Sequence, residues 1–126
     1  GAGAVGVSSG DTLDIRDSTF TNNSSLDSGG AVFALNLTGF TCETATFVAN
    51  IASNNTGGGV FTSNVGPVNF TANDFARNEA GTAGGGLFAT DSTGTNPLFT
   101  NVSNVFIDNT APTFPDSFAA GFSNTS

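Results

Sequence analysis

A short pattern, Phe-x-x-Asn, recurs along this chain at nearly constant intervals. Its four copies are Phe20–Asn23, Phe47–Asn50, Phe75–Asn78 and Phe106–Asn109. The Phe residues of successive copies are 27, 28 and 31 positions apart. Self-similarity at such a period indicates a chain built from stacked structural repeats, because a unit of this length cannot bury an apolar face by itself. No other feature of the sequence limits the possible folds as strongly.

Two further elements recur in step with this pattern. The glycine-rich copies are Gly30-Ala31-Val32-Phe33, Gly58-Gly59-Val60-Phe61 and Gly85-Gly86-Leu87-Phe88, and Gly3-Ala4-Val5-Gly6 fits the same frame. The apolar pairs at positions i and i+2 are Leu13/Ile15, Phe40/Cys42 and Val68/Phe70. Alternation of this kind is typical of β-strands. The clusters of Gly, Asn, Ser, Thr and Asp between the elements are typical of turns.

Together these elements predict an all-β fold, namely a parallel β-helix (solenoid) of about four coils of about 27 residues, with three short strands per coil. Stacked coils bury the apolar faces that one coil leaves open, and their equivalent strands pair about 4.8 Å apart. An α-helical fold is excluded, because Gly, Asn, Ser and Thr dominate and no apolar stripe with a period of about 3.6 residues is present.

We expect residues 1–126 to form a single β-helix segment of a larger protein, since the chain contains no Met. Its coils are expected at about residues 3–29, 30–57, 58–84 and 85–111. Residues 112–126 depart from the pattern, because Pro112 and Pro115 interrupt any strand. They are expected to be irregular or to begin a further coil, with Ala120–Phe122 as a weak further copy of the glycine-rich element.

The repeated Asn and Phe residues have structural roles in such a stack. We expect an Asn ladder, in which each side-chain amide donates to the Asn of a neighbouring coil, and an interior column of stacked Phe rings. The ladder consists of Asn23, Asn50, Asn78 and Asn109, and the column consists of Phe20, Phe47, Phe75 and Phe106.

The orientation of the glycine-rich strand is left open by the sequence. Val32 and Phe33 must face opposite ways, because successive side chains alternate across a strand. Either Val32, Val60 and Leu87 point inward, or Phe33, Phe61 and Phe88 do. We favour Phe inward, because an outer aromatic row would need to be covered by a neighbouring chain or domain.

The charge balance excludes several kinds of partner. The chain has 10 acidic residues and only Arg16 and Arg77 as basic ones, which gives a net charge of −8. Nucleic acids and anionic membranes are therefore not expected as partners, since both attract Lys and Arg. Membrane insertion is not expected either, because the longest apolar run, Ala31–Leu35, is far shorter than the ~20 residues of a membrane helix.

No catalytic, metal or cofactor site is predicted. The chain has no His and no Lys, so a base and anion-binding groups for polysaccharide cleavage are nearly absent. Asp11, Asp14, Asp17 and Asp27 do not follow the spacing of a calcium-binding loop, and we interpret them as a solvated face. The single residue Cys42 is interpreted as a small buried hydrophobic residue.

Asn-x-Ser/Thr sequons mark candidate sites of N-glycosylation. They begin at Asn22, Asn23, Asn36, Asn54, Asn69, Asn101 and Asn124. The preferred candidates are Asn36, Asn54, Asn69 and Asn101, which fall near predicted turns or outer faces. Asn23 is instead expected to be committed to the ladder.

The combination of GGA-[ILV] with FxxN in one repeat resembles the polymorphic outer membrane protein repeat known from chlamydial autotransporter adhesins. The matching residues are GGAV at 29–32 and FTNN, FVAN, FARN and FIDN beginning at 20, 47, 75 and 106. The resemblance covers roughly residues 3–109 and implies a pectin-lyase-like, right-handed parallel β-helix that is exported to the cell surface.

The expected function is that of a structural or adhesive segment of an extracellular, cell-surface or filament-forming protein, without catalysis. Its expected partners are neighbouring coils or copies of the same protein, stacked along the axis, and covalent N-glycans. The alternative is a carbohydrate-binding or polysaccharide-cleaving domain, which an acidic groove with bound sugar would favour.

Overall fold

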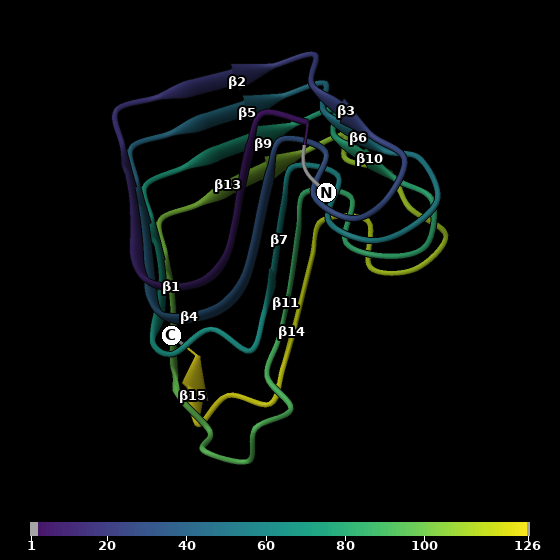
Figure 1. Cartoon of the computed structure of the whole chain (residues 1–126). Coiled ribbons are helices and arrows are strands. Elements are labelled where there is room, and N and C mark those ends of the chain that lie inside the picture. Colours follow the sequence, from purple (N-terminus) through teal and green to yellow (C-terminus); the bar gives the residue numbers. More distant parts are fainter. Residues whose placement is uncertain (1–2, 126) are drawn as a thin grey trace.

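The computed structural model describes residues 3–125, and it describes side chains for residues 3–123. Positions 1, 2 and 126 of the expected segment, and the side chain of Asn124, lie outside the described residues. Within the described stretch, the regular elements are β-strands. The chain winds through about four turns and part of a fifth, and equivalent strands of successive turns lie side by side (Figure 1). The predicted all-β fold, a parallel β-helix, is confirmed.

Three parallel sheets run along the stack. The largest sheet contains β1 (Val5–Arg16), β4 (Val32–Glu43), β7 (Val60–Ser63), β8 (Val68–Thr71), β11 (Leu87–Thr90), β12 (Leu98–Val102), β14 (Ser117–Ala120) and β15 (Asn124–Thr125). The second sheet contains β2 (Thr19–Thr21), β5 (Thr46–Val48), β9 (Asp74–Ala76) and β13 (Val105–Ile107). The third contains β3 (Ser24–Ser25), β6 (Ile51–Ala52) and β10 (Glu79–Ala80).

The register of the strands aligns the repeated motifs. In the largest sheet the aligned positions are Val5, Val32, Val60, Leu87 and Ser117. In the second sheet Phe20, Phe47, Phe75 and Phe106 are aligned. The fifth copy of the glycine-rich strand is therefore β14, and the weak copy predicted at Ala120–Phe122 is wrong. The true copy is hard to recognise in the sequence, because Phe114, Pro115 and Asp116 stand at the positions of Gly84, Gly85 and Gly86.

The coils differ from the predicted three strands in two ways. Strand β4 joins two predicted strands, pairing with β7 through its first residues and with β8 through its last. In the third coil Pro67, which has no N–H, lies between β7 and β8 and separates them. The strands of the third sheet are only two residues long, and such short segments have no alternating apolar pattern that sequence analysis can detect.

The strands change direction at single residues in the left-handed region. In the second coil these are Asn36, Thr44 and Ala49, with φ of 57°, 55° and 57°. The second residue after each Phe of the Phe-x-x-Asn motif has this conformation in every coil, and these residues are Asn22, Ala49, Arg77 and Asp108. Left-handed backbone is uncommon outside Gly, Asn and Asp, so the surrounding pairing of the coils imposes it at Ala49 and Arg77.

The core lies inside the coils, and it corrects the favoured orientation of the glycine-rich strand. Val32, Val60 and Leu87 are fully buried, whereas Phe33, Phe61 and Phe88 are only partly buried on the outer face. The prediction that these Phe residues point inward is wrong. A Cβ on Gly59 would already lie 3.3 Å from the ring of Phe75, so the Phe column fills the interior beside this strand and leaves room for Val or Leu.

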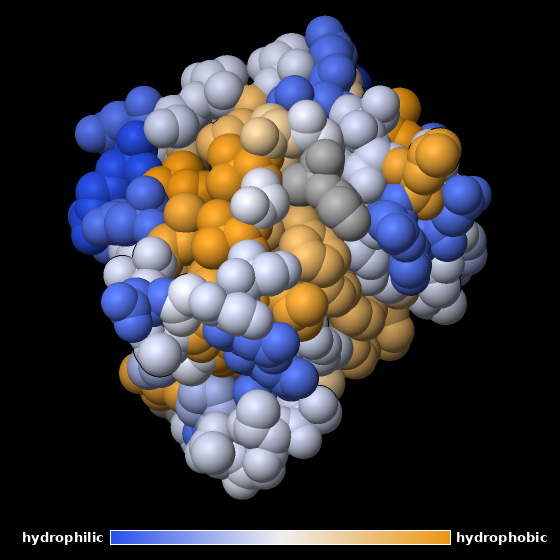
Figure 2. Space-filling model, in the orientation of Figure 1, coloured by the Kyte–Doolittle hydropathy of each residue, from blue (hydrophilic) through white to orange (hydrophobic). Residues whose placement is uncertain are grey.

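An apolar surface is visible at one end of the stack. In Figure 2 it occupies the centre of the ring of strands and is framed by polar residues. In the first coil Val5, Val7, Leu13 and Phe20 pack against the core but are only partly buried. These side chains have the same inward positions as fully buried residues of the second coil.

Candidate functional site

The four predicted Asn residues form one continuous ladder. The backbone N–H and the Nδ2 of Asn50 both donate to Oδ1 of Asn78, at 3.0 and 2.9 Å. Asn23 makes the same pair of bonds to Asn50, and Asn78 makes it to Asn109. The other Nδ2 hydrogen donates to the carbonyl of a Phe in the preceding coil, as from Asn78 to Phe47 at 2.9 Å. These buried amides are thus fully used in joining three coils.

The predicted Phe column lies beside the ladder. The ring centroids of Phe20 and Phe47 are 5.0 Å apart, those of Phe47 and Phe75 are 4.9 Å apart, and those of Phe75 and Phe106 are 4.8 Å apart. The planes differ by no more than 8°. The distances equal the spacing of neighbouring strands, so the pairing of the backbone sets the stacking of the rings.

A second, shorter Asn ladder was missed by the sequence analysis. Asn73 is fully buried, its Oδ1 accepts from the N–H of Ala45, and its Nδ2 donates to the carbonyl of Cys42. Its backbone N–H and Nδ2 both donate to Oδ1 of Asn104 at 2.9 Å. The signal is an Asn two positions before Phe75 and Phe106. Only two of the four coils carry it, so it did not register as a repeat.

An outer aromatic row follows the outward face of the largest sheet. It consists of Phe33, Phe61, Phe88 and Phe118. Successive ring centroids are 5.1, 6.0 and 5.1 Å apart, and the planes differ by 18°, 6° and 21°. Because the rings stack on one another, the faces between neighbouring rings are covered, and the partly buried rings present their edges to solvent. This row corresponds to the less favoured of the two orientations that the sequence allows for the glycine-rich strand.

The structure separates the candidate glycosylation sites. Asn36 and Asn54 are exposed, and within the described residues neither side-chain amide makes a hydrogen bond. Asn69 is half-buried on the outer face of β8, and its Oδ1 accepts from the hydroxyl of Thr71.

Asn101 does not lie on an outer face, contrary to the prediction. It pairs with the inward-facing residue Phe70, and its Oδ1 accepts from Nδ2 of Asn104. The stretch from Thr90 to Phe99 is four residues longer than the paired stretch from Ser63 to Val68, and this insertion made the register of β12 hard to predict from the sequence.

The charged side chains are dispersed over the surface. Asp11, Asp14, Asp17 and Asp27 are exposed. Arg16 Nε lies 2.8 Å from an Asp14 carboxylate oxygen, and Arg16 also contacts Glu43. The hydrogen bond and the charge of Asp14 raise the pKa of Arg16. Among the described residues, no three His, Cys, Asp or Glu side chains are grouped closely enough to hold a metal ion.

Cys42 is buried in an inward-facing column of the core. The side chains of Ile15 and Phe70 are its neighbours in this column. Burial is the main cause that raises the pKa of its thiol to about 12, and the carboxylates of Glu43 and Asp14 add to the shift. A thiol of this kind is protonated at neutral pH and is a poor nucleophile.

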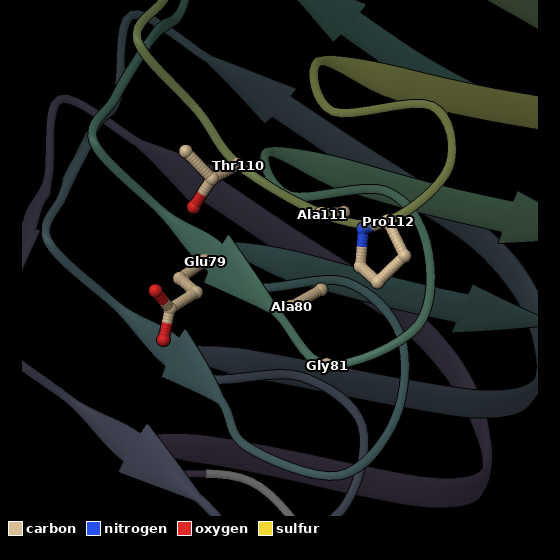
Figure 3. A pocket seen from close by; sticks show the side chains of 6 residues that line it. All are labelled: Glu79, Ala80, Gly81, Thr110, Ala111 and Pro112. Atoms are coloured by element: carbon tan, nitrogen blue, oxygen red, sulfur yellow. The ribbon is translucent and has the colours of Figure 1, made fainter.

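Two shallow depressions lie on the outer surface. One, of about 360 Å³, is lined by Glu79, Ala80, Gly81, Thr110, Ala111 and Pro112. Figure 3 shows the Glu79 carboxylate and the Thr110 hydroxyl on one side and the Pro112 ring on the other. The second, of about 350 Å³, lies on the outer face of β5, β9 and β13, where Asp74 is its one ionisable side chain. Each depression thus offers a single carboxylate, which is less than the acid and base pair of a glycosidase.

Parallel strands one turn apart, with columns of like side chains, define this protein as a repeat protein of the β-solenoid class. Residues 17–35 match the family model of the Chlamydia polymorphic membrane protein (Chlamydia_PMP) repeat. The match and the stacked strands together fit a repeat of the polymorphic membrane protein type in a β-helix. No curated protein and no solved structure matches the chain, so the pectin-lyase-like relationship stays a prediction. The described residues contain no helix with the length and hydropathy needed to cross a membrane.

Proposed function

We propose that this chain is a structural or adhesive β-helix segment of an extracellular surface protein. The proposal rests on the contrast between the inward and the outward face of the second sheet. Inward, Phe recurs in every coil of the second sheet, whereas the outward residues beside it change from coil to coil. These outward residues are Thr19, Thr46, Asp74 and Val105. The repeated part of the sequence thus serves cohesion between coils, which suits a shaft that presents a variable surface.

The proposal includes a cell-surface location and the absence of catalysis. The location is supported by the match of residues 17–35 to a membrane protein repeat of Chlamydia. A role without catalysis is supported by the use of the recurring Asn and Phe side chains, which are engaged in hydrogen bonds and ring stacking between coils. The outer depressions with one carboxylate each agree with it.

The alternative of a carbohydrate-binding surface is less well supported. Aromatic side chains that bind sugars offer the face of the ring, and the outer aromatic row offers ring edges. Both faces of Phe61 and Phe88 are covered by neighbouring rings at 5.1 to 6.0 Å. Phe33 is paired with Gly6, which has no ring to cover its face towards the first coil. An apolar row of edges on a sheet is better suited to contact with protein.

The proposed partners are neighbouring coils of the same protein or another copy. The partly exposed apolar side chains of the first coil, Val5, Val7, Leu13 and Phe20, continue inward columns that are buried in the second coil. A further coil placed on β1 would bury them and would pair with the free edge of the strand.

N-glycans are the second proposed feature of the surface, at Asn36 and Asn54. Both amides are exposed and unengaged within the described residues. By contrast, Asn23 donates to Asn50 of the next coil, and Asn101 accepts from Asn104 of its own coil. The donor would be an oligosaccharide on a polyprenyl diphosphate. A bond forms between Asn Nδ2 and the anomeric carbon as the bond from that carbon to the diphosphate breaks, and Nδ2 loses one proton.

Surface labelling of intact cells of the source organism tests the location. A membrane-impermeant, carboxyl-directed biotin reagent is applied to whole cells and, as a control, to lysed cells, and tryptic peptides are then identified by mass spectrometry. We expect the chain to be labelled equally in both samples. Labelling in lysed cells alone would contradict a surface role.

Adhesion is tested separately with beads coated with the purified chain, and glycans are tested on the native protein. We expect coated beads to bind whole cells more than beads coated with the unfolded chain do. Enzymatic release of N-glycans in H2¹⁸O converts the modified Asn to labelled Asp. We expect the label at positions 36 and 54 and not at position 23. Binding of a soluble acidic polysaccharide in place of cells would favour the alternative function.

A further inference from the structure

One glycine position in each coil is a direct contact between neighbouring coils. The residues at this position are Gly3, Gly30, Gly58 and Gly85. A Cβ added to Gly30 would lie far inside van der Waals contact of the carbonyl oxygen of Gly58, and a Cβ on Gly58 would meet that of Gly85 in the same way. Each coil therefore lies with this backbone position directly against the next coil, and a residue with a side chain does not fit there.

The same glycines donate hydrogen bonds to the next coil. The N–H of Gly30 donates to the carbonyl of Gly57 at 3.0 Å, and the N–H of Gly58 donates to the carbonyl of Gly84 at 3.0 Å. In both pairs the donor belongs to the earlier coil and the acceptor to the following one. Regular stacking at this turn thus requires a residue that has an N–H and no side chain.

In the fifth coil this position is occupied by Pro115. A Cβ added to Gly85 would lie against the carbonyl oxygen of Pro115, just as one on Gly58 would lie against that of Gly85. Pro115 is therefore the residue of the fifth coil at this glycine position. Proline lacks the N–H and carries a ring, so it fails both requirements towards a following coil. The fourth coil can stack on the fifth, because the side chain of Pro115 points away from it, but a sixth coil cannot stack on Pro115 with the same spacing.

Asn109 of the Asn ladder contacts the same turn. In the inner coils one Nδ2 hydrogen donates to the Asn of the next coil, as from Asn78 to Asn109 at 3.0 Å. Nδ2 of Asn109 instead donates to Oδ1 of Asp116, at 3.4 Å. Asp116 of the fifth coil thus accepts from the ladder residue of the fourth coil.

The preceding residue departs from the glycine pattern as well. Phe114 precedes Pro115 as Gly29, Gly57 and Gly84 precede the glycines of the contact position, and all four have positive φ, 48° for Phe114. Its ring packs on Phe118, with centroids 4.6 Å apart, at the end of the outer aromatic row. Three consecutive residues thus replace the small residues of the earlier coils.

We propose that Phe114, Pro115 and Asp116 form an axial stop, which prevents another coil from stacking on the fifth coil in the regular geometry. The inference rests on the proposed structural function and sharpens its partner. A coil of a second copy cannot stack on Pro115 in the regular geometry either, so this turn does not serve as a head-to-tail contact between copies. The coil that covers β1 must carry glycine and a free N–H at the contact position, as the inner coils of a solenoid do.

The test compares the unmodified chain with the triple variant F114G/P115G/D116G, and Pro112→Gly is the matched control at an exposed proline of the same turn. Sedimentation velocity over a hundredfold range of concentration, in 0.5 M NaCl to screen the negative charge, reports association. Electron microscopy reports the shape of any particles. We expect the unmodified chain and the control to form no rods, and the triple variant to form rods that lengthen with concentration.

Two results would overturn the proposal. One is rods of axially stacked copies formed by the unmodified chain, which needs no variant. The other is a triple variant with the circular dichroism spectrum of the unmodified chain and no greater mass at any concentration. If the triple variant does not fold, Pro115→Gly alone replaces it and must also increase association. Either failure leaves surface labelling and adhesion unaffected, so the proposed function is judged separately.

Discussion

At the scale of single residues, Thr62 is the least satisfied polar side chain of the core. It is fully buried between Ala34 and Ala89, and its hydroxyl has no hydrogen-bond partner within the described residues. Thr62→Val keeps the shape and removes the hydroxyl, so we expect the free energy of unfolding to rise by about 1 kcal/mol. Urea denaturation measures it. Thr41→Val on the outer face of β4 is the control, expected within about 0.5 kcal/mol, and an unchanged or lower stability of Thr62→Val would contradict the assignment.

Among the Asn residues of the ladder, replacement of Asn78 should lower the free energy of unfolding most. Its side chain accepts from Asn50 twice and donates to Phe47 and to Asn109. Asn78→Ala leaves buried donors and an acceptor without partners, each of which costs about 1–3 kcal/mol. We expect the free energy of unfolding to fall by roughly 3 kcal/mol or more. Asn54→Ala, at an exposed Asn, should change it by less than about 0.5 kcal/mol, and equal effects of the two changes would refute the ladder's role.

Cys42 should make the free energy of unfolding of this chain depend on pH in the alkaline range. The sequence has no Tyr, Lys or His, so Cys42 is its only side chain whose ordinary pKa lies between about 8 and 11. Burial raises its pKa from 9.0 to about 12. Stability is therefore complete below pH 9 and falls between pH 9 and 12, because the unfolded thiol ionises first.

The measurement is urea unfolding of wild type and Cys42→Ala at pH 8 and pH 10.5. We expect the wild type to lose up to about 1.4 kcal/mol per pH unit above pH 9, while the Ala variant, less stable at pH 8, keeps its value. Parallel losses in both proteins would show that Cys42 is not the source.

At the scale of elements, the glycine turns decide how closely coils approach. Gly58→Ala would press a methyl group on the backbone of Gly85 in the next coil and of Glu79 at the end of its own coil. We expect a loss of about 1–3 kcal/mol in the free energy of unfolding, as for overpacked cores. Gly39 is a suitable control, since a Cβ there would lie 3.5 Å from its nearest neighbour, Thr12. Gly39→Ala should be neutral or stabilising, and thermal unfolding of both variants checks the contrast.

The spacing of motifs in the sequence was enough to predict the stacked elements. The Phe of each Phe-x-x-Asn copy is paired with the Phe of the next copy on the neighbouring strand. This is the arrangement predicted for the Phe column and the Asn ladder. The apolar pairs Leu13/Ile15 and Phe40/Cys42 are likewise in register. A repeat period determines which residues lie above one another, and this is sufficient for columns.

The orientation of a strand depends on information that the period does not contain. Alternation separates Val32 from Phe33 but does not say which faces inward. The width of the interior decides this, and it depends on Phe75 from another part of the coil. Asn101 was misplaced for a related reason, because the insertion before β12 shifts this strand without any change in its local pattern.

At the scale of the whole molecule, each coil is stabilised by the coils on either side of it. In such a solenoid the local stability is approximately a sum of contributions from each repeat and from its interfaces with its neighbours. Fully buried side chains are concentrated from Ala31 to Ala89, in the coils with neighbours on both sides. The residues of β1 and β14 are mostly exposed or partly buried. Stability should therefore be highest at the middle coils and lower at both ends.

Hydrogen exchange followed by mass spectrometry measures this gradient. We expect peptides that cover β4, β7 and β8 to exchange most slowly, with an opening free energy close to that of global unfolding. Peptides that cover β1 and β14 should exchange faster, because loss of an end coil breaks one interface and loss of a middle coil breaks two. Asn78→Ala should speed exchange in β5 and β13 as well as in β9, since its ladder bonds reach both neighbouring coils. Uniform exchange along the chain would mean that the coils unfold as one unit and that stability is not built up from nearest neighbours.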